Sequence, residues 1–491
     1  MDASTRDECF PGTRRDILAF ITDWLTTPSK ENILWLHGLA GSGKSTLSTT
    51  TARYFSGLGR LGAFLFFIRP MSDPSSVVRT IAYQLASFDP HIGEAIAKTI
   101  EDFPRIAESS LPDQLQKLVI EPLSSASHNS LQFQGPVVLV LDALDECGDS
   151  RSRTKLLSAL AEGLCKIPTT YRIFITSRTE RDIKSALGGL PNVLAKELEI
   201  TTQSTSEDIL SYLHHRVIKV QVDNSLGPNW PGINRIRGLA RRSAGLFIWA
   251  STAASFIEDA HDPNESLNKL LEPELRVEAE AALDALYTTA LSAAGNWKDK
   301  AFVEDFHAIL GIILVAREPF SDSAIDHLLG ADKRQPSMRT LSRLGCVLRY
   351  NPGQSIQVLH PSFADYLSDR KRCGDVPWFI DPMLSQWKIS AHCLIHFTNK
   401  NASDVCYSSR FCDHHVQTTL DWFESIELGK SEVAGQPSYG INPNVYPVAS
   451  LQHCDPFRFL KRPPNFNMDA LAHSVHTIAV ATLTPHLTQE V

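Results

Sequence analysis

The sequence predicts an α/β fold, in which a parallel sheet is covered by helices on both faces, followed by an all-helical domain and a winged-helix-like domain. Three observations predict it. Short apolar runs alternate with amphipathic segments from 31 to 202, which is typical of strands that are buried on both faces and joined by helical crossovers. From about residue 205 the apolar residues recur mainly at helical spacing. Further on, Asn351-Pro352-Gly353 lies between two short apolar runs and indicates a β-hairpin.

Size and composition limit the function classes. The chain of 491 residues has room for about three domains. Its net charge of -8 disfavours nucleic acid as the main partner, because phosphate backbones need a basic face. The longest apolar run near the middle, 308–316, is too short to span a bilayer. Nine scattered cysteines and the lack of an apolar signal core predict reduced thiols and a cytoplasmic location.

The elements of the α/β domain follow one another in a regular order. An amphipathic helix is expected first, over 14–30, inside an N-terminal segment of residues 1–30. The α/β domain itself, 31–202, is expected to open with a strand. Because each strand is followed by a helix, the strands should run parallel, with their carboxyl ends at one edge of the sheet. The strands are expected over 32–38, 61–68, 135–147, 171–180 and 193–200, and the helices over 43–55, 76–88 and 152–166.

Helices dominate the rest of the chain. The helical domain is expected over 203–298, and the winged-helix-like domain over 299–372, with Ser321 capping one of its helices. The last part, 373–491, is expected to be helical, and its sequence holds no motif that indicates a role. These helices are expected over 206–220, 233–259, 279–294, 302–316 and 321–330, with a loop at 227–232.

The most informative motif lies between the first expected strand and the next helix. It runs Gly-Leu-Ala-Gly-Ser-Gly-Lys-Ser from residue 38 and fits G-x-x-x-x-G-K-[ST] in full, so the α/β domain is expected to be a P-loop NTPase. Glycines let several backbone N–H groups converge on one phosphate, and the helix adds its positive N-terminal end. Lys44 would neutralise the β- and γ-phosphates, and the Ser45 hydroxyl would bind Mg2+. The expected nucleotide-binding residues of this motif are Gly38, Gly41, Ser42, Gly43, Lys44, Ser45 and Thr46.

A second Mg2+ ligand is expected from an acid at the end of a neighbouring apolar strand. Asp142 follows such a run, in VVLVLD, and Asp145 and Glu146 come one turn later. Carboxylates at this place would orient or activate the attacking water. The alternative is that these acids only cap the next helix, and the glycine motif makes the metal site the better interpretation.

Arg178 ends the fourth expected strand, in TSR, at the edge where open α/β sheets bind their ligands. There its guanidinium would touch the γ-phosphate and report its presence. The alternative is a surface arginine that forms a salt bridge. Position alone supports the first interpretation.

Taken together, GLAGSGKS, LVLDALDE and FITSR, in that order, resemble the NACHT domain of STAND-class signalling NTPases. The acidic strand is the most specific feature: a small residue, Ala143, follows Asp142, and the next acid is Asp145. The flanking segments CFPGTRRDILAFITDWL, RTIAYQLA, SAGLFIWA and VLHPSFADYLSD are similar to fungal NLR-like proteins with a nephrocystin-like N-terminal domain. The resemblance covers about 6–400.

This resemblance implies a switch. ADP would hold a closed arrangement, and exchange for ATP would open the molecule for oligomerisation, in a signalling role such as non-self recognition, innate immunity or programmed cell death. It also implies that His360, in VLHPSF, contacts the bound diphosphate; the alternative is a hairpin-end histidine with a structural hydrogen bond. Many relatives have a proline after the glycine of the helical domain, whereas here Gly245 is followed by Leu246, Phe247 and Ile248. Lacking an effector domain before residue 6 and sensing repeats after 400, the chain is expected to be a fragment or a truncated product.

Three functions follow from these observations. The first is a signalling switch that binds Mg-ATP, hydrolyses it slowly and associates with itself; its effector and ligand are unknown. The second is a P-loop small-molecule kinase, which would need an arginine-rich lid and an acceptor pocket that the sequence does not indicate. The third is a scaffold that binds nucleotide without catalysis, against which the complete set of acids argues. ATP or ADP is favoured over GTP because no N-K-x-D motif for guanine follows the later strands, although the family uses both nucleotides.

Six cysteine and histidine residues in the last part of the chain are candidate zinc ligands. Zinc ligands come in pairs at short, regular spacing, and here the spacing is irregular. We therefore expect ordinary core or surface residues. The six are Cys406, Cys412, His414, His415, His453 and Cys454.

Overall fold

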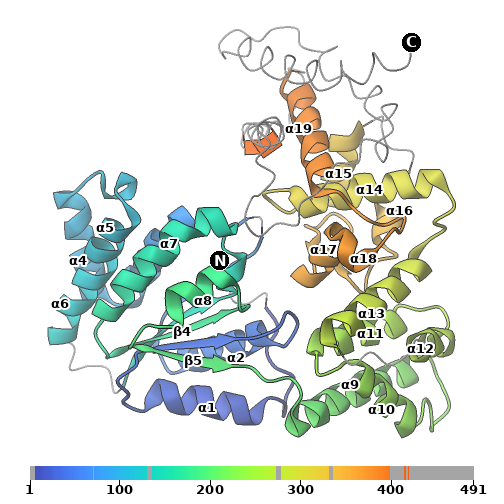
Figure 1. Ribbon diagram of the computed structural model, residues 1–491, viewed down its shortest axis with the longest axis horizontal. Helices are drawn as coiled ribbons and strands as arrows, with labels where there is room; N and C mark the ends of the chain where they lie inside the picture. The colour runs from blue at the N-terminus through green and yellow to red at the C-terminus, as the bar shows by residue number, and fades with distance from the viewer. Residues whose placement is uncertain are drawn as a thin grey trace. The chain divides into compact units, whose positions relative to one another are not determined.

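The computed structural model describes most of the chain up to residue 398 and groups it into two units (Figure 1). The first unit runs up to Ala294 and includes Leu344–Arg349 and Val358–Tyr366; the second holds the other described residues. The predicted domain boundaries stay predictions. The described residues are 6–69, 71–129, 135–272, 278–330, 335–398, 414–415 and 418–419.

A five-stranded, fully parallel sheet forms the centre of the first unit, in the order β2-β3-β4-β1-β5. The predicted fold class is thereby confirmed. One expectation was wrong: the acidic strand β3 does not neighbour the glycine strand β1, because β4 lies between them. The strands are β1 (Ile33–His37), β2 (Leu61–Phe66), β3 (Val137–Asp142), β4 (Tyr171–Ser177) and β5 (Val193–Glu197).

Each face of the sheet is covered by its own set of helices, as Figure 1 shows with α1 and α2 on one side and α7 and α8 on the other. Alternate strand residues belong to two cores: Leu34 and Leu36 lie in the core that also holds residues of α1 and α2, and Ile33 and Trp35 lie in the core that also holds residues of α3, α7 and α8. This burial of both faces explains why the strands read as continuous apolar runs. The helices of this part are α1 (Arg15–Thr26), α2 (Lys44–Gly57), α3 (Val77–Phe88), α4 (Pro90–Asp102), α5 (Leu111–Leu115), α6 (Glu121–Asn129), α7 (Ser150–Gly163) and α8 (Arg181–Leu187).

Several boundaries differ from the expected ones for local reasons. The first helix ends at Thr26 rather than 30, since Thr27 precedes Pro28 and is extended. The acidic strand ends at Asp142 because Ala143 has a left-handed backbone with φ 59°. The three helices α4 to α6 were not expected, although Asp89 caps α4 with proline in its first turn, a start pattern that the sequence contains.

After the sheet the first unit is helical, as predicted. A single helix was expected over 233–259, but the structure has two. Ala244 and Gly245 have positive φ and break it, and a side chain on Gly245 would begin 2.1 Å from the carbonyl oxygen of Ile200. The helices are α9 (Gln203–Asp223), α10 (Ile233–Arg242), α11 (Phe247–Glu258), α12 (Pro263–Leu271) and α13 (Ala279–Ala294).

The two helices and the β-hairpin expected for a winged helix then follow in the predicted order, with a short helix between them, α16, that was not expected. Ser321 caps α15 as predicted, accepting the backbone N–H of Ala324 at 3.2 Å. The two hairpin strands pair with each other. The elements are α14 (Lys300–Val315), α15 (Asp322–Leu329), α16 (Met338–Leu341), β6 (Leu348–Arg349), β7 (Gln357–Val358), α17 (Pro361–Ser368), α18 (Arg370–Cys373) and α19 (Pro382–Thr398).

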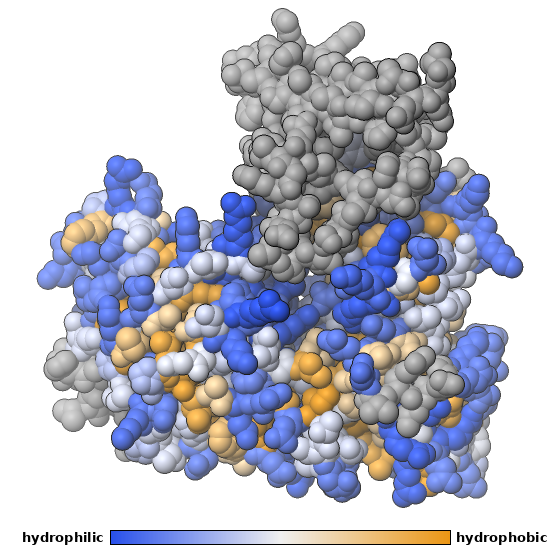
Figure 2. All heavy atoms as spheres, viewed as in Figure 1, coloured by the Kyte–Doolittle hydropathy of each residue, from blue (hydrophilic) through white to orange (hydrophobic). Residues whose placement is uncertain are grey.

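Hydrophilic side chains are spread over the face of the described residues in Figure 2, with small hydrophobic patches between them. Within those residues no helix is both long and apolar enough to cross a bilayer, and no three histidine, cysteine or acidic side chains group as metal ligands. Of the six residues considered for zinc, only His414 and His415 are described; the other four lie outside the described residues.

Candidate nucleotide-binding site

The glycine motif forms the turn from β1 into α2, as expected. Gly41 and Gly43 have φ values of 75° and 95°, which side chains disfavour. Gly41 is also packed tightly: a side chain there would begin 2.0 Å from Cγ2 of Ile248, and its carbonyl oxygen accepts the backbone N–H of Ile248 at 3.2 Å. The motif therefore needs glycine at 41 for both its backbone and its contact with α11.

The polar side chains of the motif lie at the start of α2. Lys44 donates to the carbonyl oxygens of Gly38 and Leu39, at 2.8 Å each, and burial lowers its pKa to about 8. The Ser42 hydroxyl is buried with no hydrogen-bond partner among the described residues. Thr46 donates to the carbonyl oxygen of Gly43 at 2.8 Å. An anion here would satisfy the Ser42 hydroxyl and raise the pKa of Lys44 again by stabilising its charged form.

Asp142 ends β3 at the same edge of the sheet. Its side chain is fully buried. Oδ1 accepts the hydroxyl of Thr176 from β4 at 2.7 Å, and Thr176 in turn accepts the backbone N–H of Ala143 at 3.0 Å. Nη1 of Arg6 lies 2.7 Å from Oδ2. Thr176 therefore fixes one carboxylate oxygen, and the other faces a cation.

The left-handed backbone of Ala143 starts a tight turn, Leu144–Glu146, that carries the other two acids. A β-branched or bulky side chain is strained in this conformation, which gives a physical reason for the small residue after Asp142. The Glu146 carboxyl has its pKa raised to about 8, by burial first and by the neighbouring Asp145 carboxylate second. Glu146 thus holds its proton near neutral pH.

Arg178 binds two acids from different parts of the first unit. Its backbone N–H donates to Oδ1 of Asp145 at 2.9 Å, and its Nε lies 3.2 Å from Oδ2. Its Nη1 lies 2.6 Å from Oδ2 of Asp365 in α17. Arg178 thus lies at the carboxyl edge and forms salt bridges, as the alternative interpretation expected, and its contact with a γ-phosphate stays a prediction.

His360 lies just before α17, and its imidazole is beside the glycine motif: Cε1 is 3.8 Å from the point where a side chain on Gly41 would begin. Nδ1 accepts the backbone N–H of Ser362 at 3.2 Å, so in the neutral ring the proton lies on Nε2. Burial, helped by Arg178 and Lys44, lowers the pKa of His360 to about 3. The structure thus shows the structural hydrogen bond and also places a neutral N–H donor near the phosphate loop.

Sequence reasoning missed four arginines of this site, the first of which is Arg6 on Asp142. Arg69 and Arg153 each donate to the carbonyl oxygen of Asp145 at 2.6 Å and hold the acidic turn. Arg14 donates to the carbonyl oxygen of Ser42 at 2.6 Å, and its guanidinium lies 4.7 Å from the ring centre of Phe247. No local pattern marks these arginines as parts of the site, whether the partner is 76 residues away, as for Arg69, or eight, as for Arg153.

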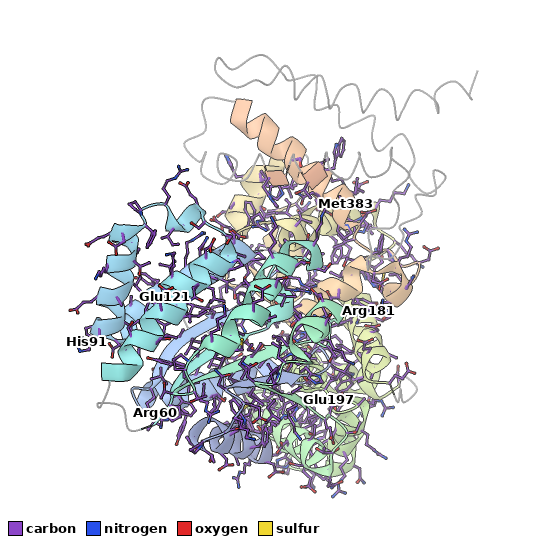
Figure 3. The ribbon with its side chains drawn as sticks, turned by 60° about the vertical axis from the view of Figure 1, so that its left-hand side comes forward. Arg60, His91, Glu121, Arg181, Glu197 and Met383 are labelled. Carbon is purple, nitrogen blue, oxygen red and sulfur yellow. The ribbon has the colours of Figure 1, made fainter. Side chains whose placement is uncertain are left out.

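The predicted site residues gather at the carboxyl edge of the sheet. In Figure 3, Glu197 at the end of β5 and Arg181 at the start of α8 label this edge, and Arg60, which precedes β2, lies at the opposite one. Ser177, the last residue of β4, accepts the indole N–H of Trp35 at 2.9 Å and the backbone N–H of Gly38 at 3.3 Å. The last residues of β4 therefore connect the glycine motif with the acids.

The residues present fit a nucleotide with Mg2+. The loop carries N–H groups and Lys44 for phosphates, and Ser45 with Asp142 supplies the hard oxygen ligands that Mg2+ prefers. The buried Ser42 hydroxyl without a partner is the observation that points to an anion. Magnesium would supply charge neutralisation for the phosphates.

The fold and the site define a P-loop NTPase, a class that implies a nucleotide and Mg2+ as ligands. Residues 12–178 are similar to the family described as nephrocystin 3, N-terminal, over about a third of the chain. The match includes every predicted site residue except His360. No curated protein matches the chain in sequence.

Solved structures resemble the chain only weakly. Cdc6p from Pyrobaculum aerophilum is 10% identical with a TM-score of 0.32, covering 79% of this chain and 98% of that chain. The ORC1 protein of Aeropyrum pernix, solved in complex with DNA, is 17% identical with a TM-score of 0.27, covering 71% of this chain and 89% of that chain. TM-scores this low carry no argument about function.

Proposed function

We propose that this chain is a nucleotide-dependent signalling switch of the NACHT type. It binds Mg-ATP, or GTP, in the cytoplasm, hydrolyses it slowly, and passes from a closed to an open arrangement that associates with itself. The observation that carries the proposal is the sharing of Arg178 between Asp145 of the acidic turn and Asp365 of α17.

Arg178 connects the phosphate site to a helix far away in the sequence. It directly follows the central strand β4 and lies close enough to Lys44 and His360 to lower their pKa values. A γ-phosphate near Lys44 would compete with Asp365 for the same guanidinium, because both are anions and Arg178 has one planar set of donors. Binding of the γ-phosphate would thereby weaken the ion pair between Arg178 and Asp365 of α17.

The segment that Arg178 holds is attached to other elements through hydroxyl groups. Ser362 and the Tyr287 hydroxyl of α13 lie 2.8 Å apart, and the Tyr366 hydroxyl lies 2.8 Å from the hydroxyl of Thr288. His360 adds its bond to Ser362. Losing the ion pair between Arg178 and Asp365 would therefore loosen the hold of the phosphate site on α17 and on the elements bonded to it. This is the kind of two-state element that a switch needs.

The test is the variant Asp365→Asn, which removes the charge that holds Arg178 and keeps the shape of the side chain. We expect ADP to leave about tenfold faster and ATP to drive more self-association. The measurements are the release rate of a fluorescent ADP analogue and particle mass by light scattering with ADP or ATP. Asp375→Asn is the matched control, since Asp375 is exposed and pairs loosely with Arg370 at 3.6 Å. Equal release rates and equal masses in both variants would refute the switch.

Hydrolysis separates the switch from a scaffold and from a kinase. A slow turnover that Asp145→Asn and Glu146→Gln abolish favours the switch. No turnover in the wild type, with nucleotide still bound, would leave a scaffold. Fast phosphate transfer to a small acceptor would leave a kinase.

A further inference from the structure

We infer that the segment Arg6–Phe10 controls access of Mg2+ to the nucleotide site, because the guanidinium of Arg6 holds the carboxylate oxygen of Asp142 that the metal needs. Loading of Mg-nucleotide then requires Arg6 to leave, and releases this segment. The inference rests on the proposed binding of a Mg-nucleotide at the P-loop, and it adds a regulation of that site.

Arg6 and Mg2+ would compete for one carboxylate oxygen, Oδ2 of Asp142. Nη1 of Arg6 lies 2.7 Å from Oδ2 of Asp142, and the carboxylate is fully buried while the arginine is about one-fifth exposed. The other oxygen accepts the buried Thr176 hydroxyl, which also braces the backbone of Ala143. Mg2+ on Asp142 would therefore take the oxygen of Arg6 rather than that of Thr176. A guanidinium and a divalent cation repel each other at this distance, so their binding is mutually exclusive.

Arg6 is held in place by contacts that can be broken. Its guanidinium lies 4.3 Å from the ring centre of Phe66, and its carbonyl oxygen accepts Nη2 of Arg53 at 3.3 Å. Arg53 also pairs with Glu8, and both of these side chains are about 40% exposed. Exposed ion pairs contribute little to stability. The bond to Asp142 is thus the main attachment of this end of the segment.

The other end of the segment is anchored more firmly. The backbone N–H of Cys9 donates to the Thr50 hydroxyl of α2 at 2.9 Å. Phe10 packs against the rings of Tyr212 and His215, with ring centres 5.5 and 5.0 Å away. Displacement of Arg6 would therefore free residues 6–8 and leave Cys9 and Phe10 in place. Replacement of the Arg6 guanidinium by Mg2+ would therefore cause an order-to-disorder change in residues 6–8.

Because Arg6 competes with the metal and not with the phosphates, its loss should change Mg2+ binding and leave nucleotide binding unchanged. The phosphates meet Lys44 and the glycine loop, which Arg6 does not contact, so binding without Mg2+ should not depend on Arg6. The Mg2+ concentration that is needed for binding of the Mg-nucleotide should depend on Arg6. Arg6→Gln removes the charge and retains a donor, whereas Arg15→Gln removes the same charge from an exposed position in α1 and serves as the matched control.

The experiment titrates Mg2+ into the full chain with a fluorescent ATP analogue at fixed concentration. We expect Arg6→Gln to lower the Mg2+ midpoint about tenfold, the usual size of one charge-assisted hydrogen bond, and Arg15→Gln to leave it unchanged. Binding in EDTA should be equal in all three proteins. An unchanged midpoint in Arg6→Gln overturns the inference. So does weaker nucleotide binding in that variant, which would make Arg6 a phosphate ligand instead.

Hydrogen exchange of the same proteins gives a readout that needs no activity. In the wild type, Mg-ATP should raise deuterium uptake in residues 6–8, and ATP with EDTA should not. Unchanged or lower uptake with Mg-ATP contradicts the inference. A wild-type chain that binds no nucleotide in either condition refutes the proposed function, whereas a chain that binds nucleotide with the same Mg2+ midpoint as Arg6→Gln refutes only the role of Arg6.

Discussion

Nη2 of Arg14 lies 2.6 Å from the carbonyl oxygen of Ser42, which joins the phosphate loop to the helical part of the first unit. The same guanidinium donates to the Thr205 hydroxyl of α9 at 3.0 Å, and the backbone N–H of Arg14 donates to Asp208 at 2.8 Å. Arg14 is only 5% exposed. A shift of the loop backbone would therefore be transmitted to α9 directly through the buried side chain of Arg14.

Arg14→Met should lower the free energy of unfolding by about 2–4 kcal/mol, because it leaves buried hydrogen-bond acceptors without a donor. We also expect weaker nucleotide binding, since the loop loses its brace. Thermal unfolding with and without nucleotide measures both effects. Arg15→Met, at an exposed neighbouring position, should change neither, and a loss of stability equal in the two variants would contradict this role of Arg14.

Lys44→Ala should empty the nucleotide site. The loop would lose the only lysine that the motif places on the phosphates, and we expect nucleotide affinity to fall by at least about a hundredfold, the usual cost of removing a charge-assisted contact from a buried anion. Mass spectrometry of the nucleotide that co-purifies with the protein measures this. Lys30→Ala, at an exposed position, is the control. Nucleotide retained in Lys44→Ala would mean that the site was assigned wrongly.

The hydrolysis rate should rise with pH through the pKa of Glu146. That pKa is raised to about 8, so the carboxyl is protonated at lower pH, and only its ionised form can accept a proton from water. Mg2+ nearby would move the midpoint below 8. Turnover measured from pH 6 to 9 tests this, with Glu162→Gln as an exposed control. A flat wild-type profile, together with an inactive Glu146→Gln variant, would show that Glu146 is ionised throughout.

His360 should act as a neutral donor at all physiological pH values. Its pKa is lowered to about 3, so ADP release should not change between pH 6 and 8, and His360→Ala should speed release about tenfold by removing one hydrogen bond to phosphate. Stopped-flow release of a fluorescent ADP analogue measures both. His327, which is exposed in α15, offers the control His327→Ala. Release that slows as the pH falls through 6.5 would indicate a charged imidazole.

Much of the fold could be predicted because its evidence is local. The strands are buried on both faces and read as apolar runs, and the glycine motif carries its own geometry in two positive φ values. Asp142, Asp145 and Glu146 were found for the same reason, since they directly follow a strand. The order of the strands could not be predicted, because no residue of β1 or β3 indicates that β4 lies between them.

The arginines of the site needed the structure. Arg6 and Asp142 are 136 residues apart, and Arg178 and Asp365 are 187 apart. An arginine in a loop or at a helix start has the same local pattern whether it faces water or a buried acid. Only the tertiary fold brings these partners together, so pairing of this kind lies beyond a reading of one sequence.

The end of β4 has a consequence for how the site tolerates change. Three consecutive residues there each hold a different part: Thr176 the metal acid, Ser177 the glycine loop, and Arg178 both the acidic turn and α17. A slip of β4 by one position would turn the Thr176 side chain to the other face of the sheet and move the Ser177 carbonyl and Arg178 along with it, so all three contacts would be lost at once. The metal site, the phosphate loop and α17 therefore all depend on the register of β4 in the sheet. A change in that register would not weaken one of these functions but remove the contacts of all three together.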